Sequence, residues 1–377
     1  MYSFVVPTRN RPAYLERLLR YYVGQELAAP MIVADSSTTP EVVAACRDLC
    51  TRARAEGLVI DHQVHDPRGS FHGKLVDALG TVTTPYAGFV ADDDFIVPAG
   101  ARACAEHLHA HPGCALAQGR ALAFTLGMEA RKEPVLTTAY PVRAIRGATG
   151  ARRLAAHLSW YSATFYAMQA TAALRQNMRL AAERCDEYQF GELLPSCLQV
   201  VQGEVALLDV LYAVRESGRQ AAGRLQAPWH AHRRRPEFAA RYARFRDAVV
   251  DELGRVDDLV APVAGVLVDQ LFLRVFLTRE RARPFALRWK RQLADAVRHA
   301  PRALAEAVTG GLPRMLADPR AAYWRLVYEH AADRPDPYRI DTLLDASSRD
   351  HTAFAPIHAL LVDDLDIADH PMRSRRT

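Results

Sequence analysis

The sequence lacks the features that define several large protein classes. Its six cysteines form no CxxC pair and show no metal-ligand spacing, so we interpret them as reduced and mostly buried. The longest apolar window, 259–277, is interrupted by Asp269 and Arg274 and contains Pro262 and Gly265. A membrane-spanning helix needs about 20 nearly continuous apolar residues. The window therefore predicts a buried helix rather than a membrane crossing.

The chain also lacks a targeting pattern, low-complexity tracts and internal repeats. Its first residues, MYSFVVPTRNRP, do not have the charged-then-apolar layout of a signal peptide, so a cytoplasmic protein is expected. Half of the 377 residues are hydrophobic and 24% are charged, which is the composition of an ordinary globular protein. This length predicts two domains more readily than one.

Short β-rich runs alternate with helical patterns near the amino terminus. Four strands are predicted, at 2–7, 31–35, 58–62 and 86–91, followed in turn by helices at 13–25, 40–57, 72–82 and 99–113. Further strands are expected at 115–126, 162–169 and 204–216, with a helix at 187–201. Strands that alternate with helices predict a mostly parallel sheet covered on both faces.

The second half of the chain has a different pattern. The segment 218–236 has the mixed charge and proline content of a connector, and everything beyond it reads as helical. The predicted helices lie at 237–256, 284–300, 301–308 and 319–331. We therefore expect a first domain at 1–218 and an all-α carboxyl-terminal domain at 219–377.

Three consecutive carboxylates, Asp92, Asp93 and Asp94, follow the predicted strand 86–91. Residues i and i+2 of an extended chain project to the same side, so Asp92 and Asp94 are expected to converge. Two convergent carboxylates raise each other's pKa unless a cation lies between them, and Mg²⁺ or Mn²⁺ accepts such oxygen ligands together with substrate phosphates. Capping of the following helix is the simpler interpretation of the same residues.

The order of four motifs supports the metal interpretation. VVPTRNRPAYLERLLRYY, MIVADSS, HGKLVDAL and TPYAGFVADDDFIVP occur in this order in about the first 220 residues. In this respect the sequence resembles family-2-like nucleotide-sugar glycosyltransferases of the GT-A fold, and most of all a bacterial branch whose acidic motif has the form DDDF. The helical remainder contributes little to the resemblance.

The resemblance implies a fold and an activity. The fold is α/β, a GT-A (Rossmann-like), mostly parallel sheet flanked by helices. The activity is metal-dependent, inverting transfer of a sugar from a UDP- or GDP-type nucleotide-diphosphate donor to an acceptor hydroxyl. A glycan, a natural product, a lipid-linked molecule or a protein would each supply such a hydroxyl. Mn²⁺ or Mg²⁺ would be the cofactor.

The resemblance also assigns residues to the nucleotide. Pro7, Thr8 and Arg9 would line its pocket, and Asp35 would accept a hydrogen bond from its base. Arg9 has a simpler interpretation as a solvated surface charge. Asp35 also has a simpler interpretation, because an aspartate side chain commonly forms a hydrogen bond within a local turn, here with Ser37 or Thr38.

The remaining implied contacts involve the diphosphate and the metal. Lys74 would offset diphosphate charge, although an exposed helix face is the commoner place for a lysine. Asp92 and Asp93 would also contact the nucleotide, and Asp94 and Asp92 would bind the metal.

The catalytic base is expected in CDEYQFGELL. The resemblance places it in an acidic pair followed by an apolar residue, which Asp186, Glu187 and Phe190 supply at the right spacing. The register favours Glu187, whereas the family more often has aspartate there, so Asp186 remains a competitor. Glu192 is expected to be structural. Compensation of a helix dipole is the simpler interpretation of the pair.

Two other classes of function remain open. A metal-dependent nucleotidyltransferase would be expected to carry a glycine-rich phosphate loop, which PTRNRPAYL does not supply. A non-catalytic nucleotide-binding or scaffold protein would use the helical region instead.

The basic residues 233–235 and 279–292 would suit peripheral contact with an anionic membrane, but no nucleic-acid module is recognisable. Self-association is left open.

Overall fold

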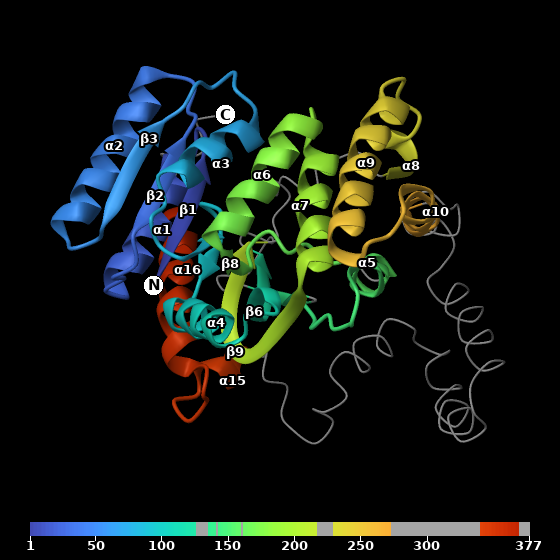
Figure 1. The fold of residues 1–377 in the computed structure, drawn as a ribbon. Helices are drawn as coiled ribbons and strands as arrows, with labels where there is room; N and C mark the ends of the chain where they lie inside the picture. The colour runs from blue at the N-terminus through green and yellow to red at the C-terminus, as the bar shows by residue number, and fades with distance from the viewer. Residues whose placement is uncertain (126–134, 141, 160, 217–228, 273–339, 369–377) are drawn as a thin grey trace.

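The computed structural model describes residues 1–125, 135–140, 142–159, 161–216, 229–272 and 340–368 (Figure 1). The strands are β1 (Tyr2–Thr8), β2 (Met31–Asp35), β3 (Ile60–Val64), β4 (Tyr86–Phe89), β5 (Phe95–Ile96), β6 (Cys114–Thr125), β7 (Val135–Tyr140), β8 (Met168–Ala170) and β9 (Glu204–Glu216). They form one sheet in the order β3-β2-β1-β4-β8-β6-β9-β5, with β7 paired to β6.

The sheet is parallel over its first four strands and mixed beyond them. β1 pairs in parallel with β2 and β4, and β2 pairs in parallel with β3, as predicted. β8 runs antiparallel to both β4 and β6, β7 is antiparallel to β6, and β5 is antiparallel to β9. An antiparallel neighbour needs no long crossover, so these shorter additions break the predicted parallel order. Because β8 is antiparallel to both β4 and β6, β6 runs in the same direction as β4 and β1. β9 is parallel to β6 and therefore runs in this direction too.

Helices cover both faces of the sheet. They are α1 (Pro12–Gly24), α2 (Pro40–Ala55), α3 (Phe71–Gly80), α4 (Pro98–Ala110), α5 (Gly150–Ser159), α6 (Thr171–Arg184), α7 (Tyr188–Gln202), α8 (Trp229–His232), α9 (Phe238–Asp257), α10 (Ala261–Phe272), α15 (Ile340–Leu344) and α16 (His351–Ala368). The α/β fold class is thereby confirmed, as are the predicted helices at 13–25, 40–57, 72–82, 99–113, 187–201 and 237–256 to within a few residues. The sequence prediction missed α5 and α6.

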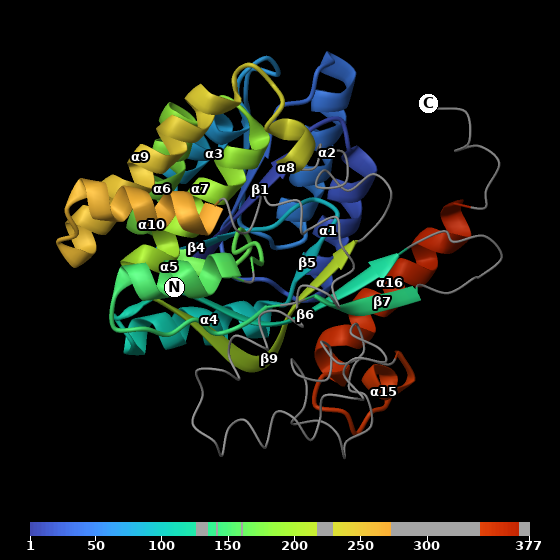
Figure 2. The same cartoon turned by 90° about the vertical axis from the view of Figure 1, so that its right-hand side faces the viewer.

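The layers follow from the alternation of side chains along β1. Phe4 and Val6 point into the hydrophobic core that α1, α2 and α4 cover, whereas Val5 points into the core that α3 and α6 cover. Figure 1 shows α3, α6 and α7 side by side over one part of the sheet, and Figure 2 shows α4 on the side away from them. β1, β2 and β4 are therefore buried on both faces, as apolar runs predict, whereas the edge strand β3 is partly exposed.

The described helices after residue 218 share hydrophobic cores with the elements before it. Phe245 of α9 and Phe272 of α10 pack in one cluster with Leu154 of α5 and Leu193 of α7. Phe354 of α16 belongs to the cluster beneath α1 and α4, and α16 lies beside α1. The predicted boundary between 1–218 and 219–377 stays a prediction. The helices predicted at 284–300, 301–308 and 319–331 lie outside the described residues.

Two expectations about buried residues have different outcomes. All six cysteines are free and five are buried, as predicted. The window 259–277 contains a helix, α10, which buries Ala264, Val268 and Phe272 but leaves Val263 and Val266 exposed by 55 and 61%. The expected buried helix is therefore buried on one side only in the part that the structure describes. Among the described helices, none combines the length and apolar composition that crossing a bilayer requires.

Candidate functional site

The polar residues predicted from the strand ends gather at one edge of the sheet. β1, β2, β4 and β9 run in the same direction, so their carboxyl ends meet there. In open α/β sheets this edge is where ligands bind. The residues at this edge are Thr8 at the end of β1, Asp35 at the end of β2, the acids 92–94 after β4, and Arg215 and Glu216 at the end of β9.

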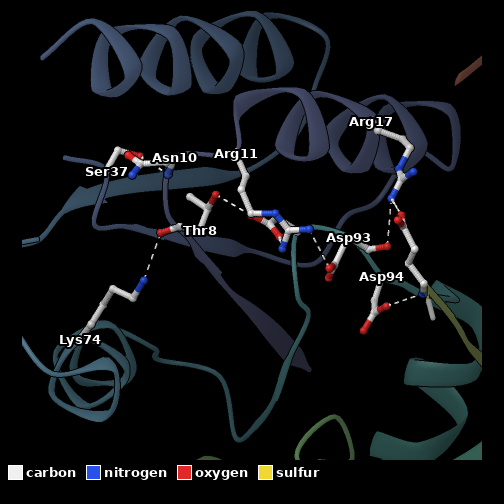
Figure 3. Close-up of polar contacts among 10 residues, drawn as sticks. Thr8, Asn10, Arg11, Arg17, Ser37, Lys74, Asp93 and Asp94 are labelled. Carbon is white, nitrogen blue, oxygen red and sulfur yellow. Dashed lines mark hydrogen bonds and ion pairs between the residues drawn. The ribbon is translucent and has the colours of Figure 1, made fainter. Parts of the chain in front are cut away.

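Asp92, Asp93 and Asp94 form a turn, named here the acidic turn, which the Asp94 N–H closes on the Ala91 carbonyl at 3.1 Å. Arg11, just before α1, bridges two of the acids: one Nη atom lies 2.8 Å from Asp92 and the other 2.8 Å from Asp93 (Figure 3). The acids are thus placed by a turn and not by an extended strand, so the alternation used to pair Asp92 with Asp94 does not describe them.

Asp94 has partners of its own on β9. Its carboxylate lies 3.1 Å from the Arg215 Nε atom and accepts the Glu216 N–H at 2.8 Å. Only 2% of Asp94 is exposed. Among the residues that the structure describes, no group of three or more His, Cys, Asp or Glu side chains has the geometry of a metal site. A cation held by Asp92 and Asp94 stays a prediction.

Burial makes the acidic turn costly to ionise. It raises the pKa of Asp92 to about 7, against the opposing effects of Arg11 and of the Thr8 hydroxyl, which donates to Asp92 at 2.7 Å. Burial likewise raises the pKa of Asp94, against the effect of Arg215. The effect of burial therefore outweighs that of the arginine partners, and both carboxyl groups hold a proton more tightly than a free aspartate does.

Lys74 reaches the same edge from α3. Only 7% of it is exposed, and its ammonium group donates to the Thr8 carbonyl at 3.1 Å (Figure 3). It also donates to the Ser36 hydroxyl at 2.9 Å. Burial lowers its pKa to about 8, although Asp35 and Asp92 oppose this. The simpler interpretation, an exposed lysine on a helix surface, is therefore wrong. Arg9 is exposed and near enough to affect Lys74 electrostatically, and Pro7 is half-buried.

Asp35 is bound by its own surroundings. It is fully buried, and one oxygen accepts the Ser37 N–H at 2.8 Å while the other lies 3.2 Å from the His62 Nε2 atom. Burial raises its pKa, but these hydrogen bonds outweigh burial, and the net pKa is lowered. The local-turn interpretation is confirmed, and contact with a nucleotide base stays a prediction.

Asn10 fixes the loop after β1 against the loop after β2. Its side-chain oxygen accepts the Thr38 N–H at 2.8 Å, and its own N–H donates to the Ser37 hydroxyl at 3.0 Å. Its φ of 56° lies in the left-handed region, which asparagine tolerates better than most residues. Both loops are therefore held in place beside Lys74.

The predicted pair of catalytic acids lies at the start of α7. Glu187 caps this helix, accepting the N–H groups of Gln189 at 2.8 Å and of Phe190. Asp186 is 55% exposed and pairs with Arg241 and Arg244 of α9 at 2.9 and 3.0 Å. Compensation of the helix terminus is thus confirmed for Glu187, and the structure turns Asp186 toward α9. A role as the base stays a prediction for both.

Several residues of this network were not predicted. Arg17 of α1 is 3% exposed and donates to the Asp93 carbonyl at 3.0 Å and to the Glu216 carboxylate at 2.8 Å (Figure 3). Arg215 and Glu216 end a predicted strand, so the strand-end rule would have found them had it been applied to 204–216. Arg11 and Arg17 carry no comparable signal.

Comparison with known proteins gives structural similarities only. No family model matches the sequence, and no curated protein matches it. S. aureus TarS 1–349 in complex with UDP-GlcNAc is 18% identical, with 87% of this chain and 90% of that chain covered and a TM-score of 0.47. The mannosyltransferase PcManGT from Pyrobaculum calidifontis, in complex with GDP-Man and Mn²⁺, is 14% identical, with 100% and 88% covered and a TM-score of 0.41.

A third similar structure is glucosyl-3-phosphoglycerate synthase from Mycobacterium tuberculosis, in complex with Mn²⁺, UDP-glucose and phosphoglyceric acid. It is 14% identical, with 67% of this chain and 80% of that chain covered and a TM-score of 0.36. At these values the similarities by themselves decide neither fold nor activity. The contacts at the carboxyl edge of the sheet carry the argument for this chain.

Proposed function

We propose that this protein is a glycosyltransferase that moves a sugar from a nucleotide-diphosphate donor to an acceptor hydroxyl. The observation that carries the proposal is the meeting of a buried lysine and an acidic turn at the end of β1. Lys74 donates to the Thr8 carbonyl, and the Thr8 hydroxyl donates to Asp92. The ammonium and the carboxylate are therefore both held in place by Thr8, at the carboxyl edge of the sheet. The order of motifs that resembles family-2-like enzymes supports the same activity.

Different residues at this edge can contact different parts of the donor. The Lys74 ammonium and the exposed Arg9 guanidinium offset the charge of a diphosphate. Pro7 and Thr8 lie beside them at the end of β1, where the nucleotide would approach the backbone. Arg11 keeps 32% of its side chain exposed while it holds Asp92 and Asp93 in position.

The acidic turn has the right donor atoms for a divalent cation. Carboxylate oxygens are the ligands that Mg²⁺ and Mn²⁺ take, and Asp92, Asp93 and Asp94 present them within one turn. We propose that Asp92 and Asp94 hold the ion. When bound, it would neutralise the departing diphosphate. Both ions fit this donor set.

Transfer to a hydroxyl also needs a base. A carboxylate that removes the acceptor's proton accelerates such a step by roughly 10²- to 10⁴-fold. Direct attack by the acceptor on the donor would invert the anomeric carbon, as the resemblance implies. We propose Glu187 or Asp186 for this role, as the resemblance implies.

The proposal is tested by thermal melting of the full chain with UDP, GDP and other nucleoside diphosphates, each with and without Mn²⁺. We expect UDP or GDP at about 100 times its Kd to raise the melting temperature by several degrees, because a ligand that binds only the folded state stabilises it. Lys74→Met should weaken that binding by about 10- to 100-fold through loss of a charge-assisted hydrogen bond. Arg47→Met, on the exposed side of α2, is the control.

Two results would contradict the proposal. No response to any nucleotide would favour a non-catalytic scaffold. A response to nucleoside triphosphates and none to diphosphates would favour a nucleotidyltransferase.

A further inference from the structure

Arg11 supplies positive charge to two carboxylates of the acidic turn. One of its Nη atoms lies 2.8 Å from an Asp92 oxygen. The other Nη atom lies 2.8 Å from an Asp93 oxygen (Figure 3). A planar guanidinium forms strong, charge-assisted hydrogen bonds with carboxylates. A divalent cation that binds Asp92 would therefore compete with Arg11 for the same carboxylate.

Three described arginines contact the acidic turn, and they differ in exposure. Arg17 is 3% exposed and is held by the Asp93 carbonyl and the Glu216 carboxylate. The Arg215 side chain is 21% exposed. The Arg11 side chain, at 32%, is more exposed than either. Of these three arginines, Arg11 is the one that a ligand arriving from solvent reaches most easily.

Arg11 also lies close to the lysine proposed to bind the diphosphate. The Asp92 carboxylate that Arg11 bonds also accepts the Thr8 hydroxyl at 2.7 Å. The Thr8 carbonyl in turn accepts a hydrogen bond from the Lys74 ammonium group at 3.1 Å. Figure 3 shows Thr8 between Lys74 and Arg11. A diphosphate that contacts both Lys74 and a cation on Asp92 would therefore come within reach of the Arg11 guanidinium.

The Arg11 side chain has one contact that does not depend on the acids. Its guanidinium lies over the Tyr14 ring, 4.0 Å from the ring centre, in the first turn of α1. A cation over the face of an aromatic ring is attracted by that ring. Arg11 can therefore turn away from the carboxylates and keep this support. A guanidinium matches the oxygens of a phosphate as well as those of a carboxylate.

From these contacts we propose that Arg11 is a further ligand of the donor's diphosphate, released to it when a divalent cation binds the acidic turn. The inference rests on the proposed glycosyl transfer. Before the donor binds, Arg11 neutralises Asp92 and Asp93. With donor and cation bound, the cation takes over the carboxylates and the guanidinium bonds phosphate oxygens. No covalent bond changes, and each ligand favours the binding of the other.

The first test measures nucleotide binding without metal, by calorimetry of the full chain in EDTA. The probe is UDP or GDP, whichever raises the melting temperature of the unaltered chain. The titrations are made at pH 8, above the pKa of about 7 that Asp92 has in the folded chain. Asp93→Asn removes one of the two charges that hold Arg11. We expect it to tighten metal-free binding by about 10-fold, because the guanidinium becomes available to the diphosphate.

A double-mutant cycle separates this release from simple charge repulsion. Loss of the Asp93 charge favours an anion to some extent whatever Arg11 does. In an Arg11→Met background, the gain from Asp93→Asn should therefore shrink to about 2-fold or less. Asp48→Asn, at an exposed position of α2, is the matched control. A gain of full size in the Arg11→Met background overturns the inference, and so does weaker binding by Asp93→Asn alone.

The second test repeats the titrations with Mn²⁺. Arg11→Met should weaken nucleotide binding about 10-fold more with Mn²⁺ than without it, because the cation frees Arg11 for the diphosphate. Arg20→Met, an exposed position on the same helix, is the matched control. Equal losses with and without Mn²⁺ overturn the inference. If Arg11→Met does not fold, Arg11→Lys replaces it, since an ammonium group lacks the planar fork that bonds two groups at once.

The outcomes distinguish the inference from the function on which it rests. Nucleotide binding that Arg11→Met leaves unchanged in Mn²⁺ overturns the inference alone. Failure of the unaltered chain to bind UDP or GDP, even with Mn²⁺, overturns the proposed function and this inference with it.

Discussion

Asp92 makes the stability of the ligand-free protein depend on pH. Its folded pKa is about 7 and its ordinary value is 3.8, so the folded chain holds this proton more tightly. The stability from this group is full below about pH 4 and is lost as pH rises through about 7. Asp92→Asn removes the dependence. Its free energy of unfolding relative to the unaltered chain should rise on the order of 2 kcal/mol from pH 5 to pH 8.

Urea unfolding at the two pH values measures this change. Asp48→Asn, at an exposed position of α2, is the matched control. A difference between Asp92→Asn and the unaltered chain that is the same at both pH values would contradict the prediction.

The sequence located the site but not its ion pairs. Thr8, Asp35 and the acidic turn were found because each lies at or just after the end of a strand, and strand ends meet at one edge in a parallel arrangement. Arg11 and Arg17 were missed because a long arginine side chain places its charge several bonds from its own backbone. Strand order alone does not say which acid such a group reaches. Lys74 was found only through the resemblance.

At the scale of elements, α7 depends on its first residue. Glu187→Ala leaves the N–H groups of Gln189 and Phe190 without their side-chain acceptor and should cost about 1 kcal/mol of unfolding free energy. Glu187→Asn keeps an acceptor oxygen and should cost only a few tenths of a kcal/mol. Chemical denaturation of both variants checks this. Equal losses for alanine and asparagine would show that the cap contributes nothing.

Elements with a clear apolar period were predicted, and elements without one were missed. Helix α6 buries Asn177 between Leu174 and Met178, where its amide bonds the Gln202 side chain at 2.9 Å. A polar residue at a buried position interrupts the apolar stripe that reveals a helix. The strand expected at 162–169 is formed only at its end, as β8, Met168–Ala170, which is too short to show a period of two. Contacts with other parts of the fold stabilise these segments, whose own sequences lack the apolar period of a helix or a strand.

At the scale of the molecule, the shared cores predict joint unfolding. Phe354 of α16 is 1% exposed in the cluster beneath α1, and Arg120 of β6 pairs with Asp350 at 2.8 Å. Phe354→Ala should therefore lower the free energy of unfolding of the whole chain by about 3–5 kcal/mol. Urea unfolding followed by fluorescence and by circular dichroism should give one coincident transition. Two separate transitions would instead support independent domains at 1–218 and 219–377.

The bond between Arg17 and Glu216 joins residues 199 positions apart in the chain. When the chain has been synthesised only as far as residue 94, Lys74 and the acidic turn are already present. Strand β9, whose Arg215 and Glu216 bond Asp94 and Arg17, has not yet been made. The proposed donor site is therefore completed late in synthesis, after β9 has emerged. A nascent chain that pauses before this strand lacks the ion pairs that hold Asp94 and Arg17 in place.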